Sequence, residues 1–423
     1  MTQRVRVFIS HSARDGDANA IRQAIRTRLE SIKVDDKPRY SILMDDVTLD
    51  PGDAWRSRIN LWLGSCDTAI VIVSKEALKS DYVAFELSVL GYRRWREQRE
   101  GRDFRIIPVF TGVTMKKVSQ SRLAPSQAGE WMGIIQGDAQ TVADKIVDAL
   151  DGVVIAAERP IEKPARVLDA YLPGTDFYVS QATEALGYEL PWDVTESKRF
   201  CLALRLLGSG MSLPAVKAVR QLRHDPAFQP NHLEKIIGLL SSAWVDLKAS
   251  EIPTLVVSET PPALLLNASF PDTARMYMRA ASYQREPVLR YNVAEPNTII
   301  EETDDNPEYM RRIVEAVRQE LFRTLQVTTD ADLAKELADS PTLGEPVFVV
   351  MSAPSISPST LDELRDKFKH VAFFLLTGTK GDTTRLAGQS VYVIRPPLGA
   401  TDEEKCREQY DDFCRRMRRP LGE

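Results

Sequence analysis

Residues 68–74 form the apolar segment that most constrains how this chain can fold. The segment reads Thr-Ala-Ile-Val-Ile-Val-Ser, and such a continuous apolar run indicates a strand buried on both faces. Around it, short apolar segments alternate with segments of helical periodicity. The predicted strands are residues 4–10, 40–44, 68–74 and 105–110, and the predicted helices are residues 17–32, 54–63, 82–95 and 141–150. This alternation predicts a parallel sheet covered by helices, with ligands binding beyond the carboxyl ends of its strands.

The remainder of the chain divides into a linker, a helical block and a second α/β block. Residues 1–150 form the first domain, and residues 151–166, with two prolines and mixed charge, predict the linker. Residues 167–250 are mostly helical in pattern, and residues 251–423 alternate strand and helix again. In this last segment the predicted strands are residues 254–257, 287–291, 346–351, 371–376 and 391–394, and the predicted helices are residues 307–325, 330–338, 359–368 and 403–418.

Charge and cysteine content argue against several classes of protein. The 423 residues carry a net charge of −5, which disfavours a general nucleic-acid binder because phosphate contacts need a basic surface. We find no apolar run of about 18 residues that would predict a membrane span, and no long apolar core of a signal peptide. The scattered cysteines and histidines predict no metal site and favour a cytoplasmic protein. The basic run at residues 93–96 is interpreted as a solvated helix face.

Glu86 is the residue of greatest chemical interest. It is a lone carboxylate in an otherwise apolar helical stretch, so it is either an exposed helix position or a partly buried functional group. Tyr82 lies four residues earlier, on the same helix face. A carboxylate beside a ribose can stabilise the oxocarbenium-like transition state through which a glycosidic bond breaks, as in glycoside hydrolysis. An aromatic ring close by can stack on a base.

Five blocks, taken in chain order, resemble the TIR domain family. Residues 7–12, Val-Phe-Ile-Ser-His-Ser, are similar to the first strand and its loop, and residues 44–55 are similar to the BB loop and the start of the next helix. Residues 66–74 resemble the central strand, residues 80–86 the stretch that bears the catalytic glutamate, and residues 105–110 the following strand. The resemblance covers about a third of the chain. It implies a flavodoxin-like α/β domain with a parallel sheet.

The resemblance also implies a site. The family's glutamate is essential for cleaving NAD+, so Glu86 is the expected catalytic residue, with NAD+ as substrate and no cofactor or metal. The expected substrate-binding residues are Tyr82, Phe8, Ser10, His11, Asp45 and Asp46. Tyr82 stands where most members have tryptophan and keeps a stacking face. For Ser10 and His11 an ordinary loop role is the alternative, and for Asp45 and Asp46 we favour a structural role in capping the loop.

Three functions follow from this interpretation. The leading one is an NAD+ hydrolase effector that assembles through its TIR domains when the C-terminal region detects a trigger. Loss of cellular NAD+ then stops growth, which suits anti-phage defence in a bacterium. The alternatives are a non-enzymatic TIR adaptor, favoured by the tyrosine at residue 82, and a producer of a cyclic ADP-ribose-type signal, which would share the same site.

The C-terminal region matches no catalytic family by its motifs. It is either a degenerate nucleotide-binding fold of the signal-transducing ATPase (STAND) type, a domain that senses a nucleotide messenger, or a partner-binding module. The segment 378–384 has the residue types of a phosphate loop in the wrong arrangement, and we interpret it as a turn. Tyr277, Arg279 and Tyr283 either line a pocket or follow from helical amphipathicity. The acidic residues 301–305 are interpreted as a solvated loop.

Overall fold

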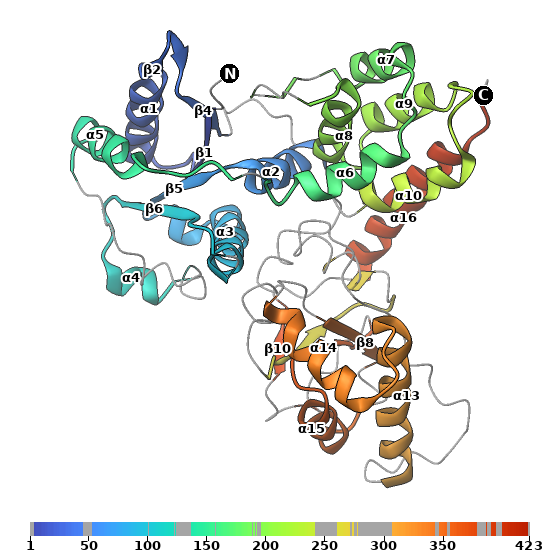
Figure 1. Ribbon diagram of the computed structural model, residues 1–423. Helices are drawn as coiled ribbons and strands as arrows, with labels where there is room; N and C mark the ends of the chain where they lie inside the picture. The colour runs from blue at the N-terminus through green and yellow to red at the C-terminus, as the bar shows by residue number, and fades with distance from the viewer. Residues whose placement is uncertain are drawn as a thin grey trace. The chain divides into compact units, whose positions relative to one another are not determined.

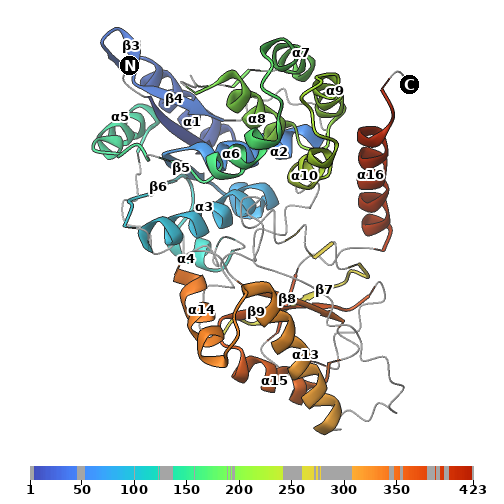
Figure 2. The same ribbon diagram turned by 45° about the vertical axis from the view of Figure 1, so that its right-hand side comes forward.

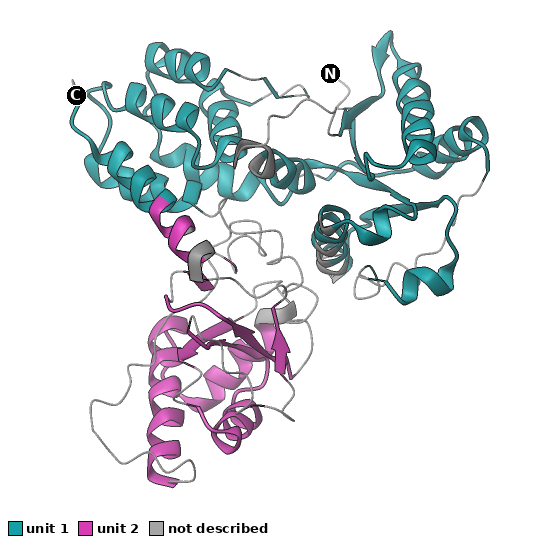
Figure 3. Cartoon of the chain, turned by 180° about the vertical axis from the view of Figure 1, so that it is seen from behind, with its two compact units in different colours: residues 1–250, 409–423 teal, residues 251–408 magenta. Residues whose placement is uncertain are grey.

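The chain folds into two compact units, here described from a computed structural model. One unit contains residues 1–250 and 409–423, and the other contains residues 251–408 (Figure 3). The structure describes residues 4–44, 53–99, 101–121, 123, 137–156, 158–187, 189–190, 192, 196–241, 260–270, 273–274, 277, 307–342, 347–352, 356–378, 386, 391–394 and 400–421. Among these residues, no helix is both long enough and apolar enough to cross a bilayer.

Several residues singled out by the sequence lie outside the described part of the chain. They are Asp45, Asp46, Arg279, Tyr283, the acidic residues 301–305, residues 379–384 of the phosphate-loop-like segment, and the predicted strands 254–257 and 287–291. Tyr277 is described and is 2% exposed.

The N-terminal domain is a parallel sheet with helices on both faces. Its strands are β1 (Val5–Ser10), β4 (Tyr40–Leu43), β5 (Thr68–Val73) and β6 (Arg105–Phe110), in the order β4-β1-β5-β6 (Figure 1). Val5, Val7 and Ile9 point to one face, where α1 (Gly16–Glu30) and α5 (Ala139–Leu150) bury their apolar residues. Helices α2 (Asp53–Ser65) and α3 (Asp81–Arg99) lie on the other face. The predicted flavodoxin-like fold is confirmed.

Short elements complete this domain. They are the two-stranded hairpin β2 (Lys33–Val34) and β3 (Lys37–Pro38), the 3-10 turn η1 (Ala77–Lys79) and the helix α4 (Met115–Ser119). In the hairpin turn, Asp35 and Asp36 both have positive φ. Aspartate tolerates that backbone region better than most residues, so this pair suits the two-residue turn.

The described residues of the helical block, in the same unit, form five helices. They are α6 (Glu162–Tyr171), α7 (Asp176–Leu186), α8 (Lys198–Ser209), α9 (Leu213–Leu222) and α10 (Pro230–Leu240). Ser197 and Ser212 begin α8 and α9, each accepting a backbone N–H of the first turn through its hydroxyl. Helix α8 packs against α2 of the N-terminal domain. The block that the sequence predicted is therefore present, with α6 and α7 as additional helices.

The second unit is built on another parallel sheet. Its described strands are β7 (Ala263–Leu266), β8 (Val347–Ser352), β9 (Val371–Leu376) and β10 (Val391–Val393), in the order β10-β7-β9-β8. Figure 2 shows β7, β8 and β9 of this sheet. Its helices are α13 (Pro307–Leu325), α14 (Asp330–Thr342), α15 (Pro358–Lys367) and the first half of α16 (Ala400–Arg418). Val317, Leu361 and Phe373 are fully buried in its core. Strand β7, which lies inside this sheet, was not predicted.

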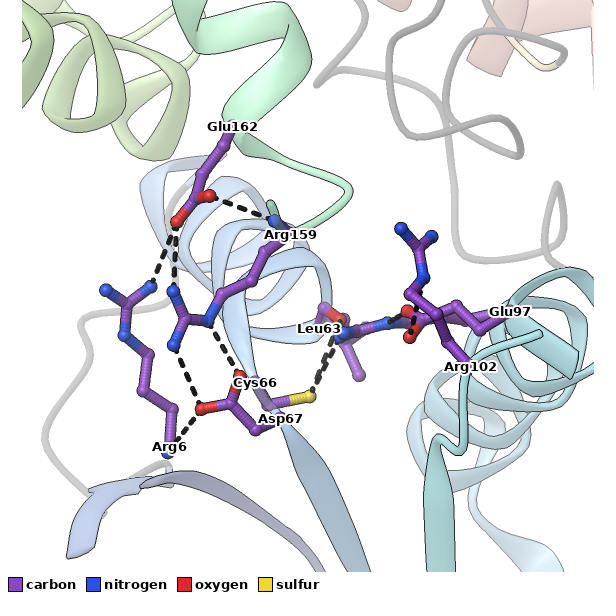
Figure 4. Close-up of polar contacts among 9 residues, drawn as sticks. Arg6, Leu63, Cys66, Asp67, Glu97, Arg102, Arg159 and Glu162 are labelled. Carbon is purple, nitrogen blue, oxygen red and sulfur yellow. Dashed lines mark hydrogen bonds and ion pairs between the residues drawn. The ribbon is translucent and has the colours of Figure 1, made fainter. Parts of the chain in front are cut away.

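A buried ion cluster joins the sheet of the N-terminal domain to the helical block (Figure 4). Arg159, which is 1% exposed, donates to both carboxylate oxygens of Asp67, over 2.9 and 3.1 Å. Glu162, at the start of α6, accepts from the backbone N–H and the guanidinium of Arg159. Arg6 of β1 lies 3.6 Å from Glu162 and stacks over the Trp192 ring. Burial, together with the charge of Arg159, lowers the pKa of Arg6 to about 10. Part of the segment predicted to be a linker is thus fixed to the sheet.

A second buried arginine ties α3 to the corner before β5. Arg93, 1% exposed, donates to Glu97 on its own helix and to the carbonyl oxygen of Leu63, over 2.8 Å. Its guanidinium also contacts the sulfur of Cys66 and lies over the ring of Phe104. Burial raises the pKa of the Cys66 thiol to about 12, although Arg93 opposes this shift. The interpretation of residues 93–96 as a solvated face is therefore wrong for Arg93.

We predict that Arg159→Met lowers the free energy of unfolding by about 3–5 kcal/mol, because it leaves the Asp67 carboxylate buried without its cation. The matched control is Arg166→Met, since Arg166 is half exposed and pairs with Glu158 and Glu196 in solvent. Arg166→Met should lower the free energy of unfolding by less than about 1 kcal/mol. Urea denaturation followed by tryptophan fluorescence measures both. Equal losses in the two variants would contradict a structural role for the buried pair.

Candidate functional site

The order of the strands defines where this sheet can bind a ligand. From β1 the chain crosses to β4 on one side, and from β4 it returns past β1 to β5 on the other side. The connections that leave β1 and β5 therefore diverge, and the region beyond the carboxyl ends of such a strand pair is where open parallel sheets generally bind ligands. Ser10 is the last residue of β1. The helix that follows β5 and η1 is α3, which carries Glu86.

Ser10 and Glu86 meet at this switch point. The Ser10 hydroxyl donates a hydrogen bond of 2.5 Å to Oε2 of Glu86. Ser10 is 1% exposed and Glu86 is 8% exposed, so the pair is almost entirely removed from water. A hydrogen bond to a carboxylate is stronger than one between neutral groups, and it fixes the orientation of the acid. The two residues are 76 positions apart, and the parallel sheet brings them together.

Ser80 caps the N-terminus of α3, the helix that carries Glu86. Its hydroxyl accepts the backbone N–H of Val83, and its carbonyl accepts the N–H of Ala84. These bonds satisfy donors that the first turn of a helix otherwise leaves free. Val83 and Leu87, which flank Glu86 along the helix, are fully buried. The apolar side of α3 therefore packs on the domain core, and the Glu86 carboxylate lies between the buried side chains of Val83 and Leu87 along the helix.

Two of the predicted aromatic residues have contrasting environments. Tyr82, one turn before Glu86, is 47% exposed, so its ring is accessible for stacking. Phe8 is 2% exposed and lies two residues before Ser10 on the same face of β1. Phe8 is therefore a buried neighbour of Ser10 along this face of β1 and is not accessible for stacking.

The loop after β1 is fixed by Asp15 and His11. The Asp15 carboxylate accepts the backbone N–H groups of Asp17 and Ala18 at the start of α1. Burial raises the pKa of Asp15, but hydrogen bonds from Ala18 and from the Ser74 hydroxyl, which follows β5, bring it below its ordinary value. The ring of His11 is partly buried, with its Nε2 3.2 Å from Nη1 of Arg22 on α1. The loops after β1 and β5 are thereby held together beside Ser10.

Asp15, Ser74 and Ser80 support the loops and the helix of the site and were not among the site residues predicted from the sequence. Asp15 and Ser80 each precede an apolar-periodic segment, which is a capping signal that the sequence contains. No local pattern marks Ser74, because its contact with Asp15 depends on the sheet.

A cavity of about 400 Å³ lies beside the edge strand β4 and is separate from this pair of residues. It is lined by Arg4, Arg26, Glu30, Pro38, Tyr40, Ser41, Ile42, Met44 and Trp62. Among the predicted site residues that the structure describes, Phe8, Ser10, His11, Tyr82 and Glu86 do not line it. Within the described ranges, no group of three or more His, Cys, Asp or Glu residues is arranged to hold a metal ion.

In the part of the chain that the structure describes, the N-terminal sheet has four parallel strands in flavodoxin-like order, and a buried serine–glutamate pair lies at its switch point. These features define an α/β domain of the flavodoxin-like class. Residues 7–146 match the TIR domain family, so this part of the chain is a TIR domain. TIR domains include both NAD+-cleaving enzymes and adaptors. Searches of curated proteins and of solved structures gave no match to this chain.

Asp15→Ala should lower the free energy of unfolding at pH 7 by about 1 kcal/mol, through loss of the cap of α1. Because the pKa of Asp15 is below its ordinary value, the folded state favours the ionised carboxylate. That contribution is present at neutral pH and is lost as the pH falls below about 4, so wild type and variant should converge there. Denaturation at several pH values measures the difference. Asp17→Ala, an exposed carboxylate of the same turn, is the control, and an equal loss there would refute the capping role.

Proposed function

We propose that this protein cleaves NAD+ to nicotinamide and ADP-ribose, or to a cyclic form of ADP-ribose, with Glu86 as the catalytic carboxylate. The observation that carries the proposal is the buried Ser10–Glu86 hydrogen bond at the switch point of a TIR domain. A carboxylate held there is positioned beyond the strand ends, where open parallel sheets bind nucleotides.

The chemistry requires a stabilised positive charge on the ribose. The bond between C1′ and the nicotinamide nitrogen breaks, and nicotinamide leaves with the bonding electron pair as a neutral molecule. Charge then develops at C1′ and the ring oxygen, where a carboxylate stabilises it or holds the ribose hydroxyls. Water attacks C1′ and releases a proton, which gives ADP-ribose. Attack by a nitrogen of the adenine instead gives a cyclic product.

The other residues of the site support binding and orientation. The Ser10 hydroxyl orients Glu86, and the half-exposed ring of Tyr82 offers a stacking surface one turn away. Because Glu86 is 8% exposed in the single chain, we propose that assembly of TIR domains opens and completes the site. Depletion of NAD+ after a trigger is detected by the C-terminal region would serve anti-phage defence.

One observation favours an adaptor as the second candidate. Tyr82 replaces the tryptophan that most family members carry, and its ring is exposed enough to contact another protein. An adaptor needs the fold and an interface but not the carboxylate. The two functions are therefore separated by the dependence of any activity on Glu86.

We expect Glu86→Gln to reduce NAD+ turnover by at least about 100-fold, because the amide keeps the shape of the side chain but removes its charge. The assay is NAD+ consumption at high protein concentration in a crowded buffer, with nicotinamide, ADP-ribose and cyclic products resolved by chromatography. Glu30→Gln, which changes an exposed carboxylate paired with Arg26, should retain wild-type turnover. Equal turnover by Glu86→Gln and wild type would exclude the proposed role. Absence of turnover by the assembled wild type would favour the adaptor.

Ser10→Ala should lower kcat about tenfold while changing KM little, because it removes one hydrogen bond that orients the acid. The matched control is Ser41→Ala. Ser41 is a buried serine of the neighbouring strand whose hydroxyl has no hydrogen-bond partner within the described ranges. Steady-state kinetics of both variants would test this, and a kcat unchanged in Ser10→Ala would remove Ser10 from the site.

A further inference from the structure

The loop after β7 in the second unit encloses a buried carboxylate. We define the β7 loop as residues 267–270 together with Thr273. Glu403 of α16, 1% exposed, accepts the backbone N–H of Ser269 on both of its oxygens, over 3.2 and 2.9 Å. It also accepts the N–H of Phe270, over 3.3 Å, and the hydroxyl of Thr273, over 2.7 Å. Glu403 is 130 to 134 residues from these donors in sequence, so the fold places it there.

The β7 loop lies at the switch point of its sheet. From β7 the chain goes to β8 and β9 on one side, and from β9 it crosses to β10 on the other side of β7. The carboxyl ends of β7 and β9 therefore lie where open parallel sheets generally bind ligands. The end of β9 is fixed to the loop, because Thr377 and Gly378 donate their N–H groups to the carbonyls of Leu266 and Ala268.

The donors of the β7 loop form a site for an anion. Consecutive backbone N–H groups that converge on one point make a concave nest that binds phosphate or carboxylate oxygens. Within the described ranges, the hydrogen-bond partners of Glu403 are the N–H groups of Ser269 and Phe270 and the hydroxyl of Thr273, all neutral donors. A buried carboxylate is costly unless such donors are already in place. Arg407, one turn along α16, lies with its guanidinium 4.0 Å from the Phe270 ring centroid, which places a cation beside the nest.

We propose that the β7 loop is a phosphate-binding site that Glu403 occupies in cis. A ligand with a phosphate group, of the nucleotide class, binds by displacing the Glu403 carboxylate from the same N–H and hydroxyl donors. Two phosphate oxygens replace the two carboxylate oxygens, and Arg407 offers a nearby positive charge.

Displacement of Glu403 would change the contacts of α16, a helix whose residues are divided between the two units. Residues 400–408 of α16 are part of the second unit, and residues 409–418 are part of the first. In the first unit, Arg418 pairs with Glu234 through two contacts of 2.8 Å, and Arg223 donates to the carbonyl oxygen of Met417. A ligand in the β7 loop therefore acts on a helix that is fixed at its other end within the unit that contains the TIR domain. The inference depends on the second unit and is independent of Glu86.

The test is to titrate the full chain with inorganic pyrophosphate and to measure the dissociation constant by isothermal titration calorimetry. Wild type should bind weakly because Glu403 competes for the donors. Glu403→Gln, which removes the charge and keeps the side-chain length, should bind at least tenfold more tightly. Glu404→Gln, which changes the exposed neighbouring glutamate, should match wild type. Thr273→Val in the Glu403→Gln background should abolish the gain, because it removes one of the donors.

Two results would overturn the proposal. One is a folded Glu403→Gln variant, verified by circular dichroism and thermal melting, that binds pyrophosphate no more tightly than wild type. The other is a gain that survives Thr273→Val, because the anion would then be bound elsewhere. If Glu403→Gln fails to fold, Glu403→Asp is titrated under the same criterion. Its shorter side chain withdraws the carboxylate from the amides and should also tighten binding relative to wild type.

Discussion

The buried pair between Arg159 and Asp67 is the constraint on which the first unit depends. Asp67 is the residue before β5, and it also accepts the backbone N–H of Arg6, so its carboxylate bridges two central strands. A charge in this position is tolerable only while its partner is present. Arg159 and the start of α6 must therefore lie against the sheet whenever the domain is folded. The helical block is consequently a fixed extension of the TIR domain, with α8 packed on α2.

Local patterns were sufficient for the N-terminal sheet but not for the site. The apolar strands follow from local patterns, because the buried strands of a parallel sheet are continuously apolar. Glu86 was singled out by the resemblance to the TIR family, since its local sequence also fits an exposed helix position. The contact between Ser10 and Glu86 follows only from the order of the strands. Arg93 illustrates the limit of such arguments. Its neighbours in sequence are charged, yet its side chain is buried because Glu97, Leu63 and the ring of Phe104 satisfy it.

The sheet of the second unit was harder to predict, because the residue composition of β7 does not distinguish a strand from a helix. Strand β7 reads Ala-Leu-Leu-Leu and has no β-branched residue, so its composition fits a helix as well as a strand. It was recognisable as a strand only through its pairing with β9 and β10. Likewise, Glu403 lies in a highly charged helix where nothing local distinguishes it from its exposed neighbours. Its burial is a property of tertiary structure, and only the β7 loop reveals it.

Strand β1 has a consequence for how this protein can vary. Arg6, Phe8 and Ser10 occupy alternate positions and so share one face of a strand whose rise is about 3.3 Å per residue. Arg6 belongs to the ion cluster at one end, and Ser10 holds Glu86 about 13 Å away at the other end. Insertion or deletion of one residue within β1 would turn this face toward α1 and α5, and the cluster and the site would be lost together. The length of β1 thus fixes the distance between Arg6 and Ser10. Related chains should therefore lack insertions and deletions within this strand, even where its side chains differ.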